Sequence, residues 1–199
     1  MTKAVSFNPK KLAGRWREGY ALDVHTVSSV YLGENQYGHA EYETTRSDVG
    51  ELLYRLKYRS DQTAVNSIVD AAAKFLRTWG PGVDLVVAVP PTRSRATQPV
   101  LVLGEAIAKS LKVPFEAGAV KKAKKATELK DVYDYDERSR LLENAHRVVT
   151  SKVAGRNVLL FDDLYRSGAT MNAITEALYD KGKVADVFAL TITRTRSNR

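Results

Sequence analysis

The stretch from residue 158 to residue 171 contains residues whose types and spacing suit the binding of a phosphorylated sugar. Four apolar residues, 158–161, are typical of a buried strand, and two adjacent carboxylates, Asp162 and Asp163, follow them directly. Helical periodicity resumes over 171–181. The short loop between contributes small, hydroxylated and basic residues: Arg166, Ser167, Gly168, Ala169 and Thr170. Loop N–H groups and a helix N-terminus hold phosphate, while carboxylates accept hydrogen bonds from sugar hydroxyls.

A surface loop is the alternative interpretation of the same residues. Asp162 and Asp163 would then be solvated, and Gly168 would only set a turn. This interpretation leaves two adjacent like charges at a strand end without a purpose. We therefore favour the ligand site.

A second loop with suitable chemistry follows the strand expected over residues 84–89. It begins at Pro90 and Pro91, which stiffen the turn, and continues with hydroxyl and guanidinium donors in Thr92, Arg93 and Ser94. In open α/β sheets ligands bind beyond the carboxyl ends of the strands, so we expect this loop to lie near 162–170. A surface turn with an exposed arginine is the alternative.

The elements that must position these loops alternate between helix and strand from residue 63 onward. Periodicity predicts helices over 63–79, 100–111 and 171–181, and strands over 84–89, 114–120, 158–161 and 185–193. This order predicts an α/β fold with a parallel sheet and helices on both faces. A further helix is expected to open near Asp48 and Glu51.

The N-terminal part differs from the rest in its pattern. Residues 1–22 are basic and irregular, and 23–32 with 40–45 are expected to form a β-hairpin around a turn at 33–38. We divide the chain into a basic segment with a hairpin, 1–46, and a main domain, 47–199.

Composition narrows the classes of function. The 199 residues with 44% hydrophobic content allow one domain with a real core, and no stretch has the length of a membrane span. We expect a cytoplasmic protein without membrane association. Cysteine is absent and three histidines are scattered, so any metal should be a hard, oxygen-liganded ion such as Mg²⁺. The net charge of +8 suits a polyanionic substrate and suits nucleic acid equally.

The stretch 158–171 resembles the phosphoribosyl pyrophosphate motif of the type I phosphoribosyltransferases. Within that superfamily, residues 47–196 are similar to ComF-type competence proteins, and 52–61 (Leu-Leu-Tyr-Arg-Leu-Lys-Tyr-Arg-Ser-Asp) resembles their helix ending in Leu-Lys-Tyr-Arg-Gly-Asp. Thr127 before the pair 137–138 and the segment 192–195 are also similar. Departures are the missing cysteine-rich module, the string 95–98 in place of Arg-Gly-Phe-Asn, and Lys130 in place of a glutamine.

The resemblance implies a type I phosphoribosyltransferase (Rossmann-like) fold with the hairpin as a hood, and a role for each loop. Asp162 and Asp163 would bind the ribose 2′ and 3′ hydroxyls near the charge that grows on the sugar ring, and 166–170 would bind the 5′-phosphate. Pyrophosphate would lie against Pro91, Thr92, Arg93 and Ser94. Mg²⁺ would be the cofactor, held by the pyrophosphate and the ribose hydroxyls rather than by protein ligands. A mobile lid over 121–144 would contain Lys124, Lys125, Thr127 and Arg138; a solvated face or a nucleic-acid patch is the alternative for its lysines.

The activity implied is transfer of a phosphoribosyl group to a nitrogen acceptor, a nucleobase or an amine, with release of pyrophosphate. A non-catalytic protein that senses phosphoribosyl pyrophosphate or associates with DNA in competence is the alternative. Acceptor specificity would come from 23–45 and 194–196, where Tyr31, Tyr37 and Tyr42 either stack on a base or pack on the protein. Arg166 stands where purine salvage members place a carboxylate, and either strengthens phosphate binding or obstructs the pocket. A homodimer is also expected.

Overall fold

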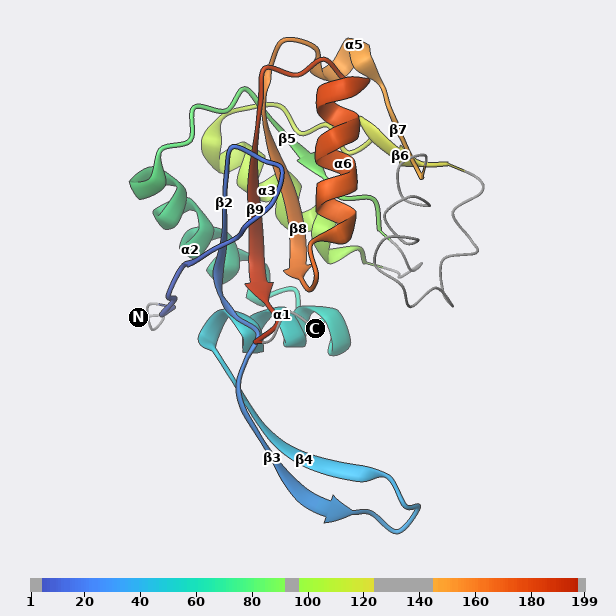
Figure 1. Cartoon of the computed structure of the whole chain (residues 1–199). Coiled ribbons are helices and arrows are strands. Elements are labelled where there is room, and N and C mark those ends of the chain that lie inside the picture. The colour runs from blue at the N-terminus through green and yellow to red at the C-terminus, as the bar shows by residue number, and fades with distance from the viewer. Residues whose placement is uncertain (1–4, 92–96, 124–144, 197–199) are drawn as a thin grey trace.

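The computed structural model describes residues 5–91, 97–123 and 145–196. A five-stranded sheet in the order β1-β2-β9-β8-β5 forms its centre, and the four strands after β1 run parallel (Figure 1). The elements are β1 (Lys10–Lys11), β2 (Glu18–Val24), β3 (Thr26–Glu34), β4 (Ala40–Arg46), α1 (Asp48–Tyr58), α2 (Ala64–Trp79), β5 (Leu85–Ala88), α3 (Pro99–Leu111), β6 (Val120–Lys122), β7 (His146–Val148), α5 (Thr150–Val153), β8 (Asn157–Tyr165), α6 (Ala169–Asp180) and β9 (Asp186–Arg194).

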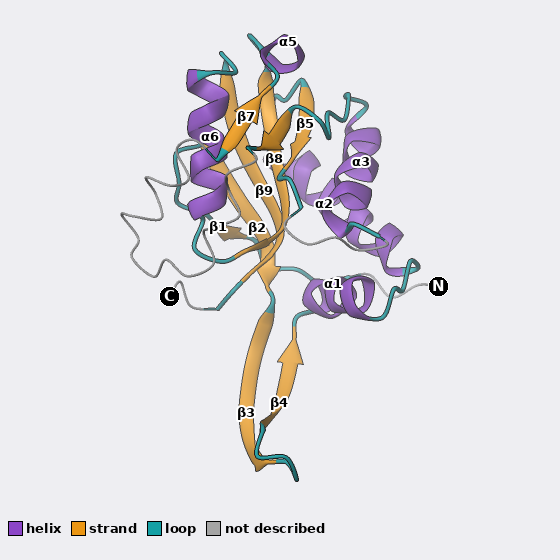
Figure 2. Cartoon of the chain, turned by 90° about the vertical axis from the view of Figure 1, so that its right-hand side faces the viewer, coloured by secondary structure: helices purple, strands orange, loops and turns teal. Residues whose placement is uncertain are grey.

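The sheet is buried on both faces, as the continuous apolar strands predict. Along β8, Leu159 and Phe161 join one hydrophobic core, whereas Val158 and Leu160 join the other. Strands β5 and β9 alternate in the same way because successive side chains of a strand point to opposite faces. Helices α2 and α3 cover one face and α6 covers the other (Figure 2). The predicted parallel α/β fold is confirmed.

The first helix lies across the carboxyl ends of the strands (Figures 1 and 2). Its N-cap is Ser47, whose Oγ accepts a hydrogen bond from the N–H of Gly50 at 3.1 Å. The same Oγ donates to the carbonyl oxygen of Val24 at 2.5 Å. The start of α1 is thereby tied to the end of β2, which fixes its last turn near the sheet edge where ligands bind.

The segment expected to be irregular, 1–22, contains two strands of the main sheet. Gly19, Ala21 and Leu22 are buried, and β2 pairs with β9 in parallel, so residues 10–11 and 18–24 belong to the central sheet. The strand expected over 23–32 is divided: β2 ends at Val24, and β3 then leaves the body with β4 as a hairpin (Figure 2).

The segment 114–120 also differs from its prediction. Phe115 makes only an isolated bridge to Val86, and Val120 begins β6, which pairs with β7 in a separate antiparallel ribbon. This ribbon flanks residues 124–144, which lie outside the described residues. None of the helices in the described ranges combines the length and the apolar character that crossing a bilayer requires.

Candidate functional site

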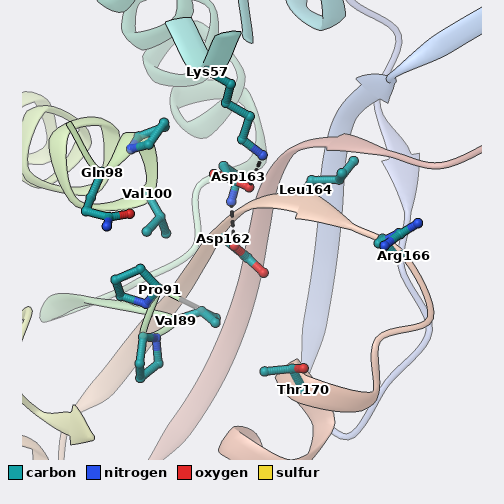
Figure 3. Close-up of a pocket in the computed structure, with 12 residues that line it drawn as sticks. Lys57, Val89, Pro91, Gln98, Val100, Asp162, Asp163, Leu164, Arg166 and Thr170 are labelled. Carbon is teal, nitrogen blue, oxygen red and sulfur yellow. Dashed lines mark hydrogen bonds and ion pairs between the residues drawn. The ribbon is translucent and has the colours of Figure 1, made fainter. Parts of the chain in front are cut away.

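A cleft of about 210 Å³ opens at the carboxyl edge of the sheet (Figure 3). Its described walls come from the last turn of α1, the segment after β5, the start of α3, and the end of β8 with the loop to α6. The lining residues are Lys57, Val89, Pro90, Pro91, Gln98, Pro99, Val100, Asp162, Asp163, Leu164, Arg166 and Thr170. The sequence predicts that the segment after β5 and the segment at the end of β8 are neighbours. Both segments line this one cleft.

Asp162 and Asp163 are both partly buried and both line this cleft. The backbone N–H of Asp163 donates to Asp162 Oδ1 at 2.8 Å. Burial and the adjacent Asp163 carboxylate raise the pKa of Asp162 to about 7, although this hydrogen bond and Lys57 act in the opposite direction. One carboxyl of the pair therefore exchanges its proton near neutral pH.

Lys57 supplies the cation that faces this pair. Its Nζ lies 2.6 Å from Asp163 Oδ1, and the two side chains are only 11% and 16% exposed. Figure 3 shows Lys57 reaching from α1 down to Asp163. An ammonium in this position balances the negative charge of Asp163 when no ligand is bound. It also adds positive charge to a cleft suited to anions.

The loop between β8 and α6 has the backbone that an anion site requires. Gly168 is the N-cap of α6 with φ +78° and has no side chain to cap the helix, while Ser167 Oγ accepts a long hydrogen bond of 3.5 Å from the N–H of Ala169. A Cβ at this position would lie 2.5 Å from the hydroxyl of Tyr165, so both conformation and space require glycine. The first N–H groups of α6 have no partner within the helix. Thr170 lines the cleft beside them, and Arg166 is exposed at its rim.

Other predicted site residues are placed differently. Pro91 lines the cleft, whereas Thr92, Arg93 and Ser94 lie outside the described residues. The expected lid residues also lie outside them, namely Lys124, Lys125, Thr127 and Arg138. Ser167, Gly168 and Ala169 form the loop without lining the cleft.

The three hairpin tyrosines line no part of the cleft. Tyr31 and Tyr42 contact each other across the hairpin, with ring centroids 5.5 Å apart, and Tyr37 is 74% exposed at the turn. Tyr31 and Tyr42 therefore pack on each other within the hairpin, and none of the three rings lines the described cleft, so stacking on a base stays a prediction.

Comparison with known proteins finds one relative by sequence and several structures of similar fold. No protein-family model matches the sequence. Competence protein ComFC of Bacillus subtilis is 26% identical over 152 residues, which cover 72% of this chain and 59% of ComFC. Among solved structures, glutamine phosphoribosylpyrophosphate amidotransferase from B. subtilis has a TM-score of 0.50 at 17% identity, with 79% of this chain and 34% of that chain covered. Adenine phosphoribosyltransferase from Thermoanaerobacter pseudethanolicus has a TM-score of 0.47 at 18% identity, with 83% and 95% covered.

The chain is similar in sequence to ComFC and has the type I phosphoribosyltransferase fold. The amidotransferase shows the fold alone, because its sequence identity is low. The chain spans about 59% of the length of ComFC, so the activity of that whole protein does not transfer to this one by similarity.

Among the described residues, Lys57 is the charged residue of the cleft to which the sequence analysis gave no site role. It stands within the string 52–61 that resembles ComF-type proteins, so a signal was present. Nothing local in the sequence shows that this lysine meets Asp163, 106 positions further along the chain.

The side chains of the cleft suit an Mg²⁺ ion that is bound mainly by oxygen atoms of a bound substrate. Among the described residues, no group of three or more carboxylate or imidazole side chains could hold a metal ion. One oxygen of the acidic pair is already bound to an ammonium. Such a site fits a hard cation that takes most of its ligands from water and phosphate oxygens.

Proposed function

We propose that this protein binds phosphoribosyl pyrophosphate in the cleft and transfers its phosphoribosyl group to a nitrogen acceptor, releasing pyrophosphate. One observation carries the proposal. The acidic pair near the end of β8 and Thr170 in the first turn of α6 line the same cleft, at the carboxyl edge of the sheet. An acidic pair that accepts hydrogen bonds from a diol, beside N–H groups that donate to phosphate oxygens, matches the two ends of a ribose 5-phosphate.

The acidic pair would bind the sugar and respond to its charge. Asp163 keeps one oxygen on Lys57 and has the other for a ribose hydroxyl. Asp162, with a pKa near 7, can be neutral before the ligand enters. Positive charge growing at the sugar ring would favour its ionised form, so the pair would stabilise the charged transition state more than the ground state.

The remaining parts of the donor would lie along the loops. The 5′-phosphate would be held by the residues 166–170, with the guanidinium of Arg166 strengthening the binding from the exposed rim. The pyrophosphate would lie beyond Pro91, against Thr92–Ser94. Mg²⁺, carried by pyrophosphate and ribose oxygens near Asp162 and Asp163, would neutralise charge on the leaving group.

Removal of the acidic pair tests the binding step. The double variant Asp162→Asn with Asp163→Asn should lose Mg²⁺-dependent binding of phosphoribosyl pyrophosphate in calorimetry while its circular dichroism stays unchanged. Asp70→Asn, at an exposed position of α2, is the matched control and should bind normally. Unchanged binding by the double variant would remove the basis of the proposal.

Turnover is tested separately from binding. Pyrophosphate release is measured with a panel of nucleobases and amines as acceptors. Release with at least one acceptor supports transfer, whereas tight binding without release from any acceptor points to the second candidate function.

The second candidate is a protein that binds the phosphoribosyl donor without transfer and associates with DNA in competence. The similarity to ComFC and the net charge of +8 favour it. DNA binding of this kind should weaken steeply as salt is added, because lysines and arginines release counterions from the phosphates. Lack of binding to single- and double-stranded DNA at about 50 mM salt would argue against it.

A further inference from the structure

The β3–β4 hairpin, residues 26–46, extends from the body as a free two-stranded ribbon. Its strands pair only with each other within the described part of the chain, and both views show it standing clear of the sheet and helices (Figures 1 and 2). An isolated two-stranded hairpin is at best marginally stable in water. A ribbon of this length therefore needs a covering surface to persist.

The hairpin carries most of the exposed large hydrophobic side chains of the described residues. Seven large hydrophobic side chains are at least half exposed among the described residues, and all but Tyr58 lie between residues 27 and 42. They are Val27, Val30, Tyr31, Leu32, Tyr37 and Tyr42, between 50% and 74% exposed. Exposed apolar side chains gathered on one projecting element suit an interaction surface. The cleft does not use them, since no residue of the hairpin lines it.

The root of the hairpin is held firmly, so the ribbon has a fixed direction. The N–H of His25 donates to the carbonyl oxygen of Arg194 at 2.7 Å, and Arg196 Nη1 donates to the carbonyl oxygen of Val27 at 2.9 Å. Arg46 pairs with Glu51 of α1 at 3.4 Å. A nine-residue strand rises about 30 Å, which is enough to reach across a neighbouring domain.

Charge identifies the kind of surface that this ribbon fits. The hairpin contains three glutamates, Glu34, Glu41 and Glu43, and one arginine, Arg46, which is paired with Glu51 at the root. The hairpin has a net charge of −2, and the rest of the chain has a net charge of +10. The hairpin thus repels nucleic acid and repels a second hairpin, but it is complementary in charge to the body of another copy of this chain.

We propose that the β3–β4 hairpin is a dimerisation arm that lies on the basic body of a second copy of this chain. In a two-fold dimer the arm of each copy lies on the body of the other copy. Both arms are then covered, and the symmetry leaves no arm exposed for a third copy. The apolar side chains of the arm provide the buried centre of the interface, and Glu41 and Glu43 face the basic surface of the partner.

Sedimentation equilibrium of the full chain over a range of concentrations tests the arm. We expect a mass of twice the 22.1 kDa chain. Val30→Thr with Leu32→Thr keeps strand-forming residues while removing apolar contacts, and should raise the dimer Kd at least tenfold. Tyr58→Ser removes an exposed aromatic outside the arm and should leave the mass unchanged.

Charge reversal gives a second, independent measurement. Glu41→Lys with Glu43→Lys should also raise the dimer Kd at least tenfold, and the wild-type dimer should weaken as salt is added. Far-ultraviolet circular dichroism of each variant checks that the body is folded. A monomer at every concentration, or a dimer whose Kd none of the arm variants changes, would overturn the proposal.

Discussion

The ion pair between Lys57 and Asp163 should contribute to stability far more than a surface pair of the same length. Lys152 and Glu116 provide the comparison, since both pairs have an N–O distance of 2.6 Å. The side chains of the first pair are 11% and 16% exposed, and those of the second are 43% and 26% exposed. The two pairs therefore differ in burial at constant geometry.

Coulomb's law sets the scale of the difference. At 2.6 Å, an effective dielectric constant near 20 gives an attraction of about 6 kcal/mol, whereas that of water gives about 1.6 kcal/mol before screening by salt. Desolvation of both charges offsets much of the attraction in the cleft. Lys57→Met should lower the free energy of unfolding by about 2–3 kcal/mol, because Asp163 is left partly buried without a partner. Lys152→Met should lower it by less than about 1 kcal/mol.

Urea denaturation at neutral pH measures both losses, with an unchanged m-value as evidence that the same folded state is compared. Asp163→Asn completes a double-mutant cycle with Lys57→Met. We expect a coupling energy of about 2 kcal/mol, because the lysine loses its partner at 2.6 Å in the Asn background. Equal losses from the two methionine variants, or a coupling energy below about 0.5 kcal/mol, would refute this reasoning.

Three further outcomes are expected. The folded-state pKa of Asp162 is near 7, above its ordinary 3.8, so the free energy of unfolding should fall as pH rises between these values. Asp162→Asn removes this titrating group, so the stability of the variant relative to wild type should rise as pH rises over the same pH range. Urea titrations at several pH values measure this difference. Gly168→Ala should cost at least about 1 kcal/mol more than Gly80→Ala, because both have positive φ but only the former meets a tyrosine hydroxyl at 2.5 Å; thermal unfolding compares them. Lys124→Ala with Lys125→Ala should slow pyrophosphate release with little change in melting temperature if these lysines belong to a lid, and an unchanged rate would favour a solvated face.

The sequence by itself predicted the features that depend on neighbouring residues. The apolar run of β8, the acidic pair at its end, the loop glycine and the start of α6 follow one another along fourteen residues, so their order in space is set by connectivity. Helices α2, α3 and α6 were predicted to within a few residues because their apolar positions repeat every 3.6 residues.

Tertiary structure decided what depends on distant partners. Strand β2 looked irregular because its residues mix aromatic, charged and small types, and only pairing with β9 makes it an inner strand. The meeting of Lys57 with Asp163 depends on α1 crossing the sheet edge, which the capping contact of Ser47 and Val24 directs. The direction of the hairpin likewise depends on bonds from His25 and Arg196 at its root to partners far along the chain. Periodicity encodes an element and its buried face, but the choice of neighbour is made by packing between segments that the sequence separates.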